Sequence, residues 1–150
     1  MDSSIWFKKD LAIEELNALG NGTLDEHLGI TYTEIGPDFL KASMPVDQRT
    51  RQPYGLLHGG ASVVLAESLG SLGSAMVVDP VQFMCVGLEI NANHLKGVRA
   101  GFVTGTCTPI RLGRTTHVWD IRIHNENNQL VCISRLTVAV IRREDAPVKV

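Results

Sequence analysis

A single charged residue, Glu67, lies in the long apolar run between Arg51 and Asp79. Residues 54–78 read YGLLHGGASVVLAESLGSLGSAMVV, and this pattern predicts one long helix over 59–78 that ends at an Asp-Pro pair. Because the helix is apolar on nearly every side, we expect the rest of the fold to wrap around it. Burial would strip water from the Glu67 carboxylate and raise its pKa, which sequences tolerate mainly where such a group is paired or does chemistry.

The segments on either side of this helix predict a curled antiparallel sheet. Upstream, the pattern predicts a short amphipathic helix over 10–19, a one-turn helix behind a capping box at 23–26, and a hairpin of strands 30–35 and 39–46. Downstream it predicts four strands, 84–95, 102–109, 115–124 and 130–141, with turns at 97–101, 109–113 and 125–129. We therefore predict a single domain over residues 1–150, of α+β class, with an antiparallel sheet around one central helix.

Composition argues against several classes of function. The net charge of −2 gives no field that would attract nucleic acid or an acidic membrane surface. A membrane span over 59–78 is disfavoured, because Glu67 lies near its middle and its flanks lack Lys, Arg or aromatic anchors. The five histidines show no metal-ligand spacing, so we expect no metal site. The three cysteines are odd in number and widely spaced, which favours a reducing compartment, and we expect the cytoplasm.

The helix carries the strongest candidate for catalysis. Helical spacing places Ser71 one turn after Glu67 on the same face, and a carboxylate beside a hydroxyl can activate water or attack an electrophile itself. A purely structural, hydrogen-bonded Glu is the alternative. The turn Leu57–Gly60 precedes the helix, where free backbone N–H groups could polarise a carbonyl, although a tight entry into the helix would equally require its glycines.

Two further patterns bear on function, one at the start of this helix and one after it. Residues 55–62 match the spacing of a phosphate-binding loop, but Ala61 stands where that loop needs Lys, so nucleotide hydrolysis is rejected. No serine-hydrolase elbow is present. Between residues 90 and 119 there are four basic residues and no acidic one, namely Lys96, Arg99, Arg111 and Arg114. They could bind the phosphates of a ligand, or simply be solvated loop charges.

The segments QPYGLLHGGASVVLAESLGS (52–71) and GLEINANHLKG (87–97) closely resemble the hotdog-fold acyl-CoA thioesterases of the phenylacetate-pathway type. Within that family the likeness is greatest to the branches that hydrolyse 1,4-dihydroxy-2-naphthoyl-CoA in menaquinone synthesis and that proofread in enterobactin synthesis. It covers residues 16–141. The resemblance implies hydrolysis of an acyl-CoA thioester, with an aromatic acyl group, and no metal or redox cofactor. An acyl carrier protein is a possible alternative partner, and the family forms homodimers that commonly pair into homotetramers.

The resemblance also implies roles for individual residues. Glu67 would be the general base or nucleophile, Gly60 would supply the carbonyl-polarising N–H, Gln52 and His58 would contact the thioester or position water, and Ser71 would support hydrolysis. His94 would lie near the acyl and pantetheine region. The residues implied in coenzyme A binding are Gly87, the stretch 93–97 with His94, Leu95, Lys96 and Gly97, and the loop Arg111, Leu112, Gly113, Arg114, Thr115 and Thr116.

Two other functions remain open at this level. A hotdog dehydratase would use a His–carboxylate pair, but here His58 stands nine residues before Glu67 and the expected Pro-rich loop is absent. A non-catalytic acyl-CoA-binding module would have no need of a buried base, which argues against it. The sequence does not distinguish a menaquinone precursor, a proofreading substrate or a general aryl-CoA, because only the shape of the acyl pocket would do so.

Overall fold

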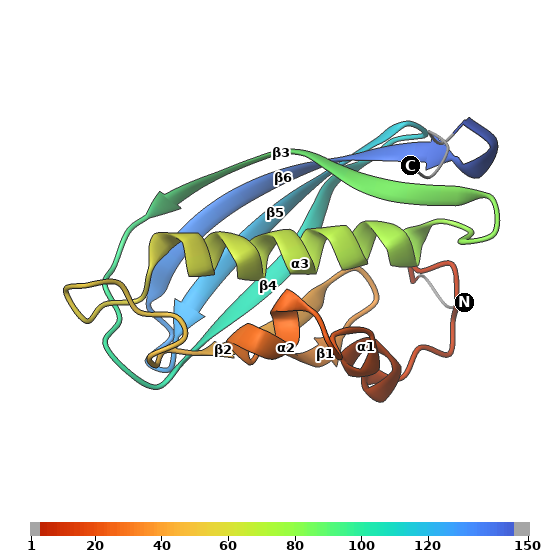
Figure 1. Ribbon diagram of the computed structural model, residues 1–150. Coiled ribbons are helices and arrows are strands. Elements are labelled where there is room, and N and C mark those ends of the chain that lie inside the picture. The colour runs from red at the N-terminus through yellow and green to blue at the C-terminus, as the bar shows by residue number, and fades with distance from the viewer. Residues whose placement is uncertain (1–3, 146–150) are drawn as a thin grey trace.

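One six-stranded antiparallel sheet curls around the long helix α3 in the computed structural model, which describes residues 4–145 (Figure 1). The elements, in chain order, are α1 (Ile13–Leu19), α2 (Leu24–Leu28), β1 (Thr31–Ile35), β2 (Leu40–Pro45), α3 (Gly59–Val77), β3 (Phe83–His94), β4 (Phe102–Leu112), β5 (Thr116–Asn125), β6 (Leu130–Arg142) and a 3-10 turn (Arg143–Asp145). The strand order is β1-β2-β4-β5-β6-β3, so β1 and β3 form the two edges. The predicted α+β architecture is confirmed.

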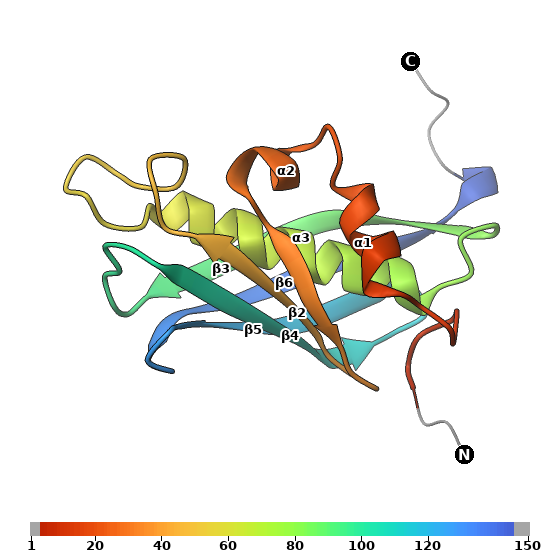
Figure 2. The ribbon, with the colours of Figure 1, turned by 90° about the horizontal axis from the view of Figure 1, so that it is seen from below.

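Helix α3 lies lengthwise in the concave face of the sheet, with α1 and α2 on the side of the helix away from β3 (Figures 1 and 2). Leu65 and Leu69 are fully buried against the sheet. Small residues allow this close approach: a Cβ atom at Gly70 would lie only 2.5 Å from Leu136 of β6. This apolar helix is therefore the core helix of the fold and not a membrane span.

The sheet wraps around α3 as predicted, but within residues 4–145 it leaves one strip of this apolar helix uncovered. Val64, Glu67 and Ser71 are half-buried and Ala75 is exposed, so a strip of the helix remains open. The reason is the strand order: β3 lies at the edge of the sheet, and no further strand within residues 4–145 covers the helix beyond it. Glu67 is consequently not enclosed by its own chain.

Several predicted boundaries shift. The first helix begins at Ile13 and not at residue 10. Thr23 caps α2 through Asp25 N–H, but Glu26 accepts a hydrogen bond from Gly22 N–H (2.6 Å), so the reciprocal capping box does not form. The turn predicted at 109–113 is also wrong. β4 continues through a register shift after Pro109 to Leu112, and the turn that follows it is closed by Gly113 N–H donating to Thr116 O (2.9 Å).

The N-terminal segment packs into the core, which the sequence did not indicate. Ile5 N–H donates to Pro37 O (2.9 Å) and Phe7 N–H donates to Met76 O (2.8 Å), which ties the segment to the β1–β2 turn and to the end of α3. Between them, Trp6 stacks on Trp119 with ring centroids 6.4 Å apart and an interplanar angle of 10°. The Trp119 indole N–H donates to Ser74 Oγ (2.7 Å). This pair closes the core beneath the C-terminal half of α3.

His117 is buried edge-on to Trp119, and its Nδ1 has no hydrogen-bond partner among the described residues. Burial lowers the pKa of His117 below its ordinary value of 6.5. The folded state therefore binds fewer protons than the unfolded state just below that value, so stability falls as the pH falls from about 7 through the lowered pKa. We predict that His117→Gln flattens this acid-side slope in urea unfolding, while the exposed control His27→Gln leaves it unchanged. Equal slopes in both variants and the wild type would contradict the assignment.

Candidate functional site

The N-terminus of α3 is held by a loop with its own hydrogen bonds. Thr50 is buried, and its hydroxyl donates to Pro45 O (2.7 Å) while its carbonyl accepts from His58 N–H (2.8 Å). His58 is the N-cap of α3: its Nδ1 accepts a hydrogen bond from Gly60 N–H at 2.8 Å. The exposed imidazole thus folds back onto the helix, and Nδ1 must be unprotonated to accept this bond.

This cap changes the assignment of the carbonyl-polarising group. The Gly60 N–H is already satisfied by His58, so Gly60 does not offer the free donor that the sequence analysis expected. The preceding amide, Gly59 N–H, makes no hydrogen bond with any residue in 4–145. It lies in the first turn, where the helix dipole favours negative charge. Gly59 therefore carries the free donor one residue earlier in the chain.

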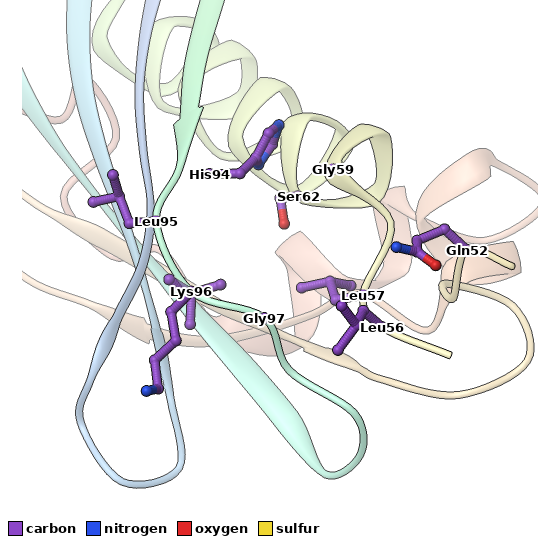
Figure 3. Close-up of a pocket in the computed structure, with 10 residues that line it drawn as sticks. Gln52, Leu56, Leu57, Gly59, Ser62, His94, Leu95, Lys96 and Gly97 are labelled. Carbon is purple, nitrogen blue, oxygen red and sulfur yellow. The ribbon is translucent and has the colours of Figure 1, made fainter. Parts of the chain in front are cut away.

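A cavity of about 340 Å³ lies at this end of α3, and Figure 3 shows its walls. It is lined by Gln52, Leu56, Leu57, Gly59, Ser62, His94, Leu95, Lys96, Gly97 and Val131. The His94 ring lies directly against Gly59, since a Cβ atom there would fall 2.6 Å from Nε2. Gln52 Oε1 accepts from Tyr54 N–H, which leaves its amide NH₂ as the donor group.

The cavity brings together five of the predicted residues, Gln52, His94, Leu95, Lys96 and Gly97. Leu95 N–H is bonded to Val131 O (2.8 Å), which fixes the segment after β3 to the start of β6. Lys96 is exposed, and in Figure 3 its side chain extends away from the helix. Lys96 can therefore bind a negatively charged group of a ligand at the mouth of the cavity, but not one inside the cavity.

Glu67 lies elsewhere, on the half-buried face of α3 that meets β3. Its Oε1 lies directly over Gly87, where any Cβ atom would collide with it. Ser71 Oγ is 3.5 Å from Glu67 Oε1, at the outer limit of a hydrogen bond. Glu67 forms no ion pair with any described residue. A carboxylate without a cation beside it keeps its basicity available for a water or an electrophile.

The predicted site residues thus lie at three different places in one chain. Gly59 and Glu67 are eight residues apart on α3, which separates them by about 12 Å along the helix axis. The loop expected to bind coenzyme A is farther still: Thr116 pairs with Ala139 and His94 pairs with Cys132, seven residues away on β6, or about 23 Å. One chain does not bring Arg111–Thr116 to the cavity.

Several lining residues escaped the sequence analysis. Ser62 is buried in the first turn of α3, and Leu56, Leu57 and Val131 supply apolar walls. Nothing in their local pattern differs from ordinary core residues, so no signal in a single sequence could have singled them out. Gly59 lies in the turn Leu57–Gly60, for which the sequence predicted free backbone N–H groups, although the family resemblance assigned the donor to Gly60. Within residues 4–145, no group of His, Cys, Asp and Glu side chains could hold a metal ion.

Comparison with known proteins identifies the family. The sequence profile described as the thioesterase superfamily matches residues 54–132, which is more than half of the chain and includes Glu67, Gly87 and His94. The chain belongs to the thioesterase superfamily. This thioesterase is 51% identical over 137 residues to the 1,4-dihydroxy-2-naphthoyl-CoA hydrolase of Escherichia coli, covering 91% of its own length and 99% of that protein. It is 50% identical over 137 residues to the proofreading thioesterase EntH of Cronobacter turicensis, covering 91% and 98%.

Solved structures agree with the sequence comparison. The crystal structure of a mutant thioesterase from Pseudomonas aeruginosa superposes with a TM-score of 0.91 at 53% identity, covering 93% of this chain and 99% of that one. A thioesterase from Haemophilus influenzae gives a TM-score of 0.88 at 50% identity, covering 92% and 95%. The hotdog thioesterase fold is therefore confirmed, and this thioesterase is a thioester hydrolase.

Proposed function

We propose that this thioesterase hydrolyses an aromatic acyl-CoA, either 1,4-dihydroxy-2-naphthoyl-CoA or a related aryl-CoA, to the free acid and coenzyme A. The observation that carries the proposal is Glu67, the one charge on the apolar core helix, which faces an open strip without an ion-pair partner in the described chain. The E. coli relative named for naphthoyl-CoA hydrolysis shares 51% of its sequence with this chain. The reaction as written needs no metal or redox cofactor.

In the proposed reaction the thioester carbonyl oxygen binds at the start of α3. The free Gly59 N–H and the Gln52 NH₂ donate to it and stabilise the negative charge that develops there. Glu67 removes a proton from water, the hydroxide attacks the carbonyl carbon, and the C–S bond then breaks to release the thiolate of coenzyme A. Alternatively Glu67 attacks first, releases the thiolate and forms an anhydride that water hydrolyses. Ser71 positions the water in either route.

The proposal requires two copies of the chain. The edge strand β3 is twelve residues long, and its Val86 and Leu88 side chains are exposed. Such an edge is normally covered, and an antiparallel partner strand would do so. Pairing about a two-fold axis near Ile90 would bring Gly87, beneath Glu67, opposite His94 of the partner subunit. Glu67 and Arg111–Thr116 of one subunit would then meet Gln52, Gly59 and Lys96 of the other. Further pairing into a tetramer, and a cytoplasmic location, remain predictions.

A carrier-protein thioester is the second candidate substrate, because relatives of about 50% identity are named proofreading thioesterases. The rim of the 340 Å³ cavity favours an acidic partner. Lys96 lies there, and Arg99 reaches the same loop, since its guanidinium donates to Tyr54 O (3.4 Å). Neither side chain pairs with an acidic residue within residues 4–145.

A substrate panel tests the proposal. We expect kcat/KM for 1,4-dihydroxy-2-naphthoyl-CoA and hydroxybenzoyl-CoA to exceed that for acetyl-CoA and propionyl-CoA, because an aryl group buries more apolar surface next to α3 than a short alkyl group does. The same aryl groups on a carrier protein are assayed in parallel. A preference for the carrier protein would move the assignment to proofreading, and equal values for aryl and short alkyl thioesters would contradict the aromatic substrate.

A further inference from the structure

One polar side chain in the cavity at the start of α3 has no role in the proposed reaction. Ser62 is only 1% exposed, and its hydroxyl makes no hydrogen bond with any residue in 4–145. In Figure 3 this hydroxyl points away from the helix into the cavity. A nearly buried polar group without a partner costs free energy, so a ligand that bonds to it gains from the contact.

The packing of α3 does not require a hydroxyl at this position. Where the helix needs only a small buried residue it has alanine, as at Ala61 and Ala66. The other buried serine of the helix, Ser74, accepts a hydrogen bond from the Trp119 indole N–H at 2.7 Å. Of the two buried serines of α3, Ser62 is therefore the one whose hydroxyl serves no contact inside the described chain.

Ser62 lies on the path that a thioester would take through the cavity. Gly59 N–H and Gln52 NH₂ mark the proposed site of the carbonyl oxygen, and Lys96 lies at the mouth, where a negatively charged group would bind. Ser62 follows Gly59 by three residues, which places it on the same face of α3 and about 4.5 Å further along the helix axis. The remaining side chains of the walls are largely apolar, namely Leu56, Leu57, Leu95 and Val131.

The chemistry of the substrate supplies a partner for this hydroxyl. In a coenzyme A or carrier-protein thioester, the first polar group beyond the sulfur is an amide, separated from it by two methylene groups. With the carbonyl at Gly59, the sulfur and two methylene groups span a length comparable with the step to Ser62. Among apolar walls this amide would otherwise lack a partner. A hydroxyl both donates and accepts, so it can bond to the amide N–H or to its C=O.

We infer that the Ser62 hydroxyl binds the first amide of the pantetheine arm and so fixes the position of the thioester along the cavity. This inference rests on the proposed function, because it places the thioester carbonyl at Gly59. It applies equally to coenzyme A and carrier-protein substrates, which share this amide. The contact is made away from the reacting carbonyl, in the bound substrate and in the transition state alike, so its loss raises KM and leaves kcat nearly unchanged.

The test varies the thiol part of the substrate and keeps the acyl group constant. Benzoyl thioesters of N-acetylcysteamine, which keeps the amide, and of pentanethiol, which replaces it with methylene groups, are assayed with wild type, Ser62→Ala and the control Ser74→Ala. We expect Ser62→Ala to raise KM for the amide-bearing thioester by about 3- to 10-fold, the worth of one neutral hydrogen bond, and to leave the pentyl thioester unchanged. Ser74→Ala removes a buried hydroxyl outside this cavity and should not alter the ratio between the two substrates.

Thermal unfolding distinguishes this contact from a structural role. The Ser62 hydroxyl has no partner in residues 4–145 and alanine is the stronger helix former, so Ser62→Ala should unfold at the same temperature as wild type or at a higher one. Ser74→Ala leaves the Trp119 N–H unpaired and should unfold at a lower temperature. Ser62→Cys keeps the shape of the side chain with a much weaker donor, and it gives the same kinetic readout if Ser62→Ala fails to fold.

The results that overturn the inference differ from those that refute the proposed function. Equal losses on both thioesters, no loss on either, or a fall in kcat at constant KM would overturn the inference. A wild type that cleaves no thioester would refute the proposed function. Calorimetric titration with pantetheine still reports on Ser62 in that case: weaker binding to Ser62→Ala than to wild type supports the contact, and equal or absent binding overturns it.

Discussion

Replacing Glu67 with Gln is expected to lower kcat by about 10²–10⁴-fold on every thioester that the protein cleaves, the usual contribution of a positioned general base. The substitution keeps the shape of the side chain and removes its basicity and its nucleophilic oxygen. Because Glu67 is half-buried and has no ion-pair partner in residues 4–145, its loss should change the thermal unfolding midpoint by little. Loss of activity with unchanged stability would locate the effect in the chemical step.

A neighbouring variant provides the control. Ser71 is 3.5 Å from the carboxylate, so Ser71→Ala should lower kcat much less than Glu67→Gln does. A single turnover in H₂¹⁸O tests for the anhydride: enzyme oxygen in the first molecule of acid requires attack by Glu67 followed by water attack on the Glu67 carbonyl, because a general base puts only solvent oxygen there. Near-wild-type kcat in Glu67→Gln would remove the carboxylate from the mechanism altogether.

Mixing two inactive variants is expected to restore activity. Glu67→Gln and Gln52→Ala each lack one half of the proposed shared site, so either homodimer should be nearly inactive. In a mixed dimer one site combines Glu67 of one chain with Gln52 of the other and is intact. Random exchange makes half of the dimers mixed, with one intact site in two, so activity should recover to roughly a quarter of the wild-type level.

The experiment discriminates sharply because the two residues belong to different groups in the structure. Gln52 lines the cavity at the start of α3, whereas Glu67 lies two turns further along, over Gly87. If both halves of the site came from one chain, every chain in the mixture would carry a defect and no activity would return. A Glu67→Gln/Gln52→Ala double variant mixed with either single variant is the matched negative control. Recovery in that control would show that contaminating activity was being measured.

Much of the fold could be predicted because local signals agreed with one another. The glycine-rich start and the Asp-Pro end bounded α3 to within one residue, and the alternating segments gave all six strands. The β4–β5 turn was misplaced because Pro109 and Gly113 are both turn residues, whereas the strand passes Pro109 through an irregular register. The sequence alone does not show that Pro109 lies within the β4–β5 strand pair whereas Gly113 lies in the turn.

The site was less predictable for a physical reason. The residue types were recognised, but which backbone amide is free depends on a side chain, since His58 turns back to occupy Gly60 N–H. The exposure of Glu67 depends on strand order, which makes β3 an edge.

The stacked pair of Trp6 and Trp119 has a practical consequence for spectroscopy. These are the two tryptophans of the chain, and both lie beneath the C-terminal half of α3, with one indole bonded to Ser74. Intrinsic emission excited at the indole band will report when the amino-terminal segment detaches from the core. Occupancy of the cavity beside Gln52 and His94, at the other end of the helix, will leave that emission almost unchanged, so ligand titrations call for an extrinsic fluorophore or calorimetry.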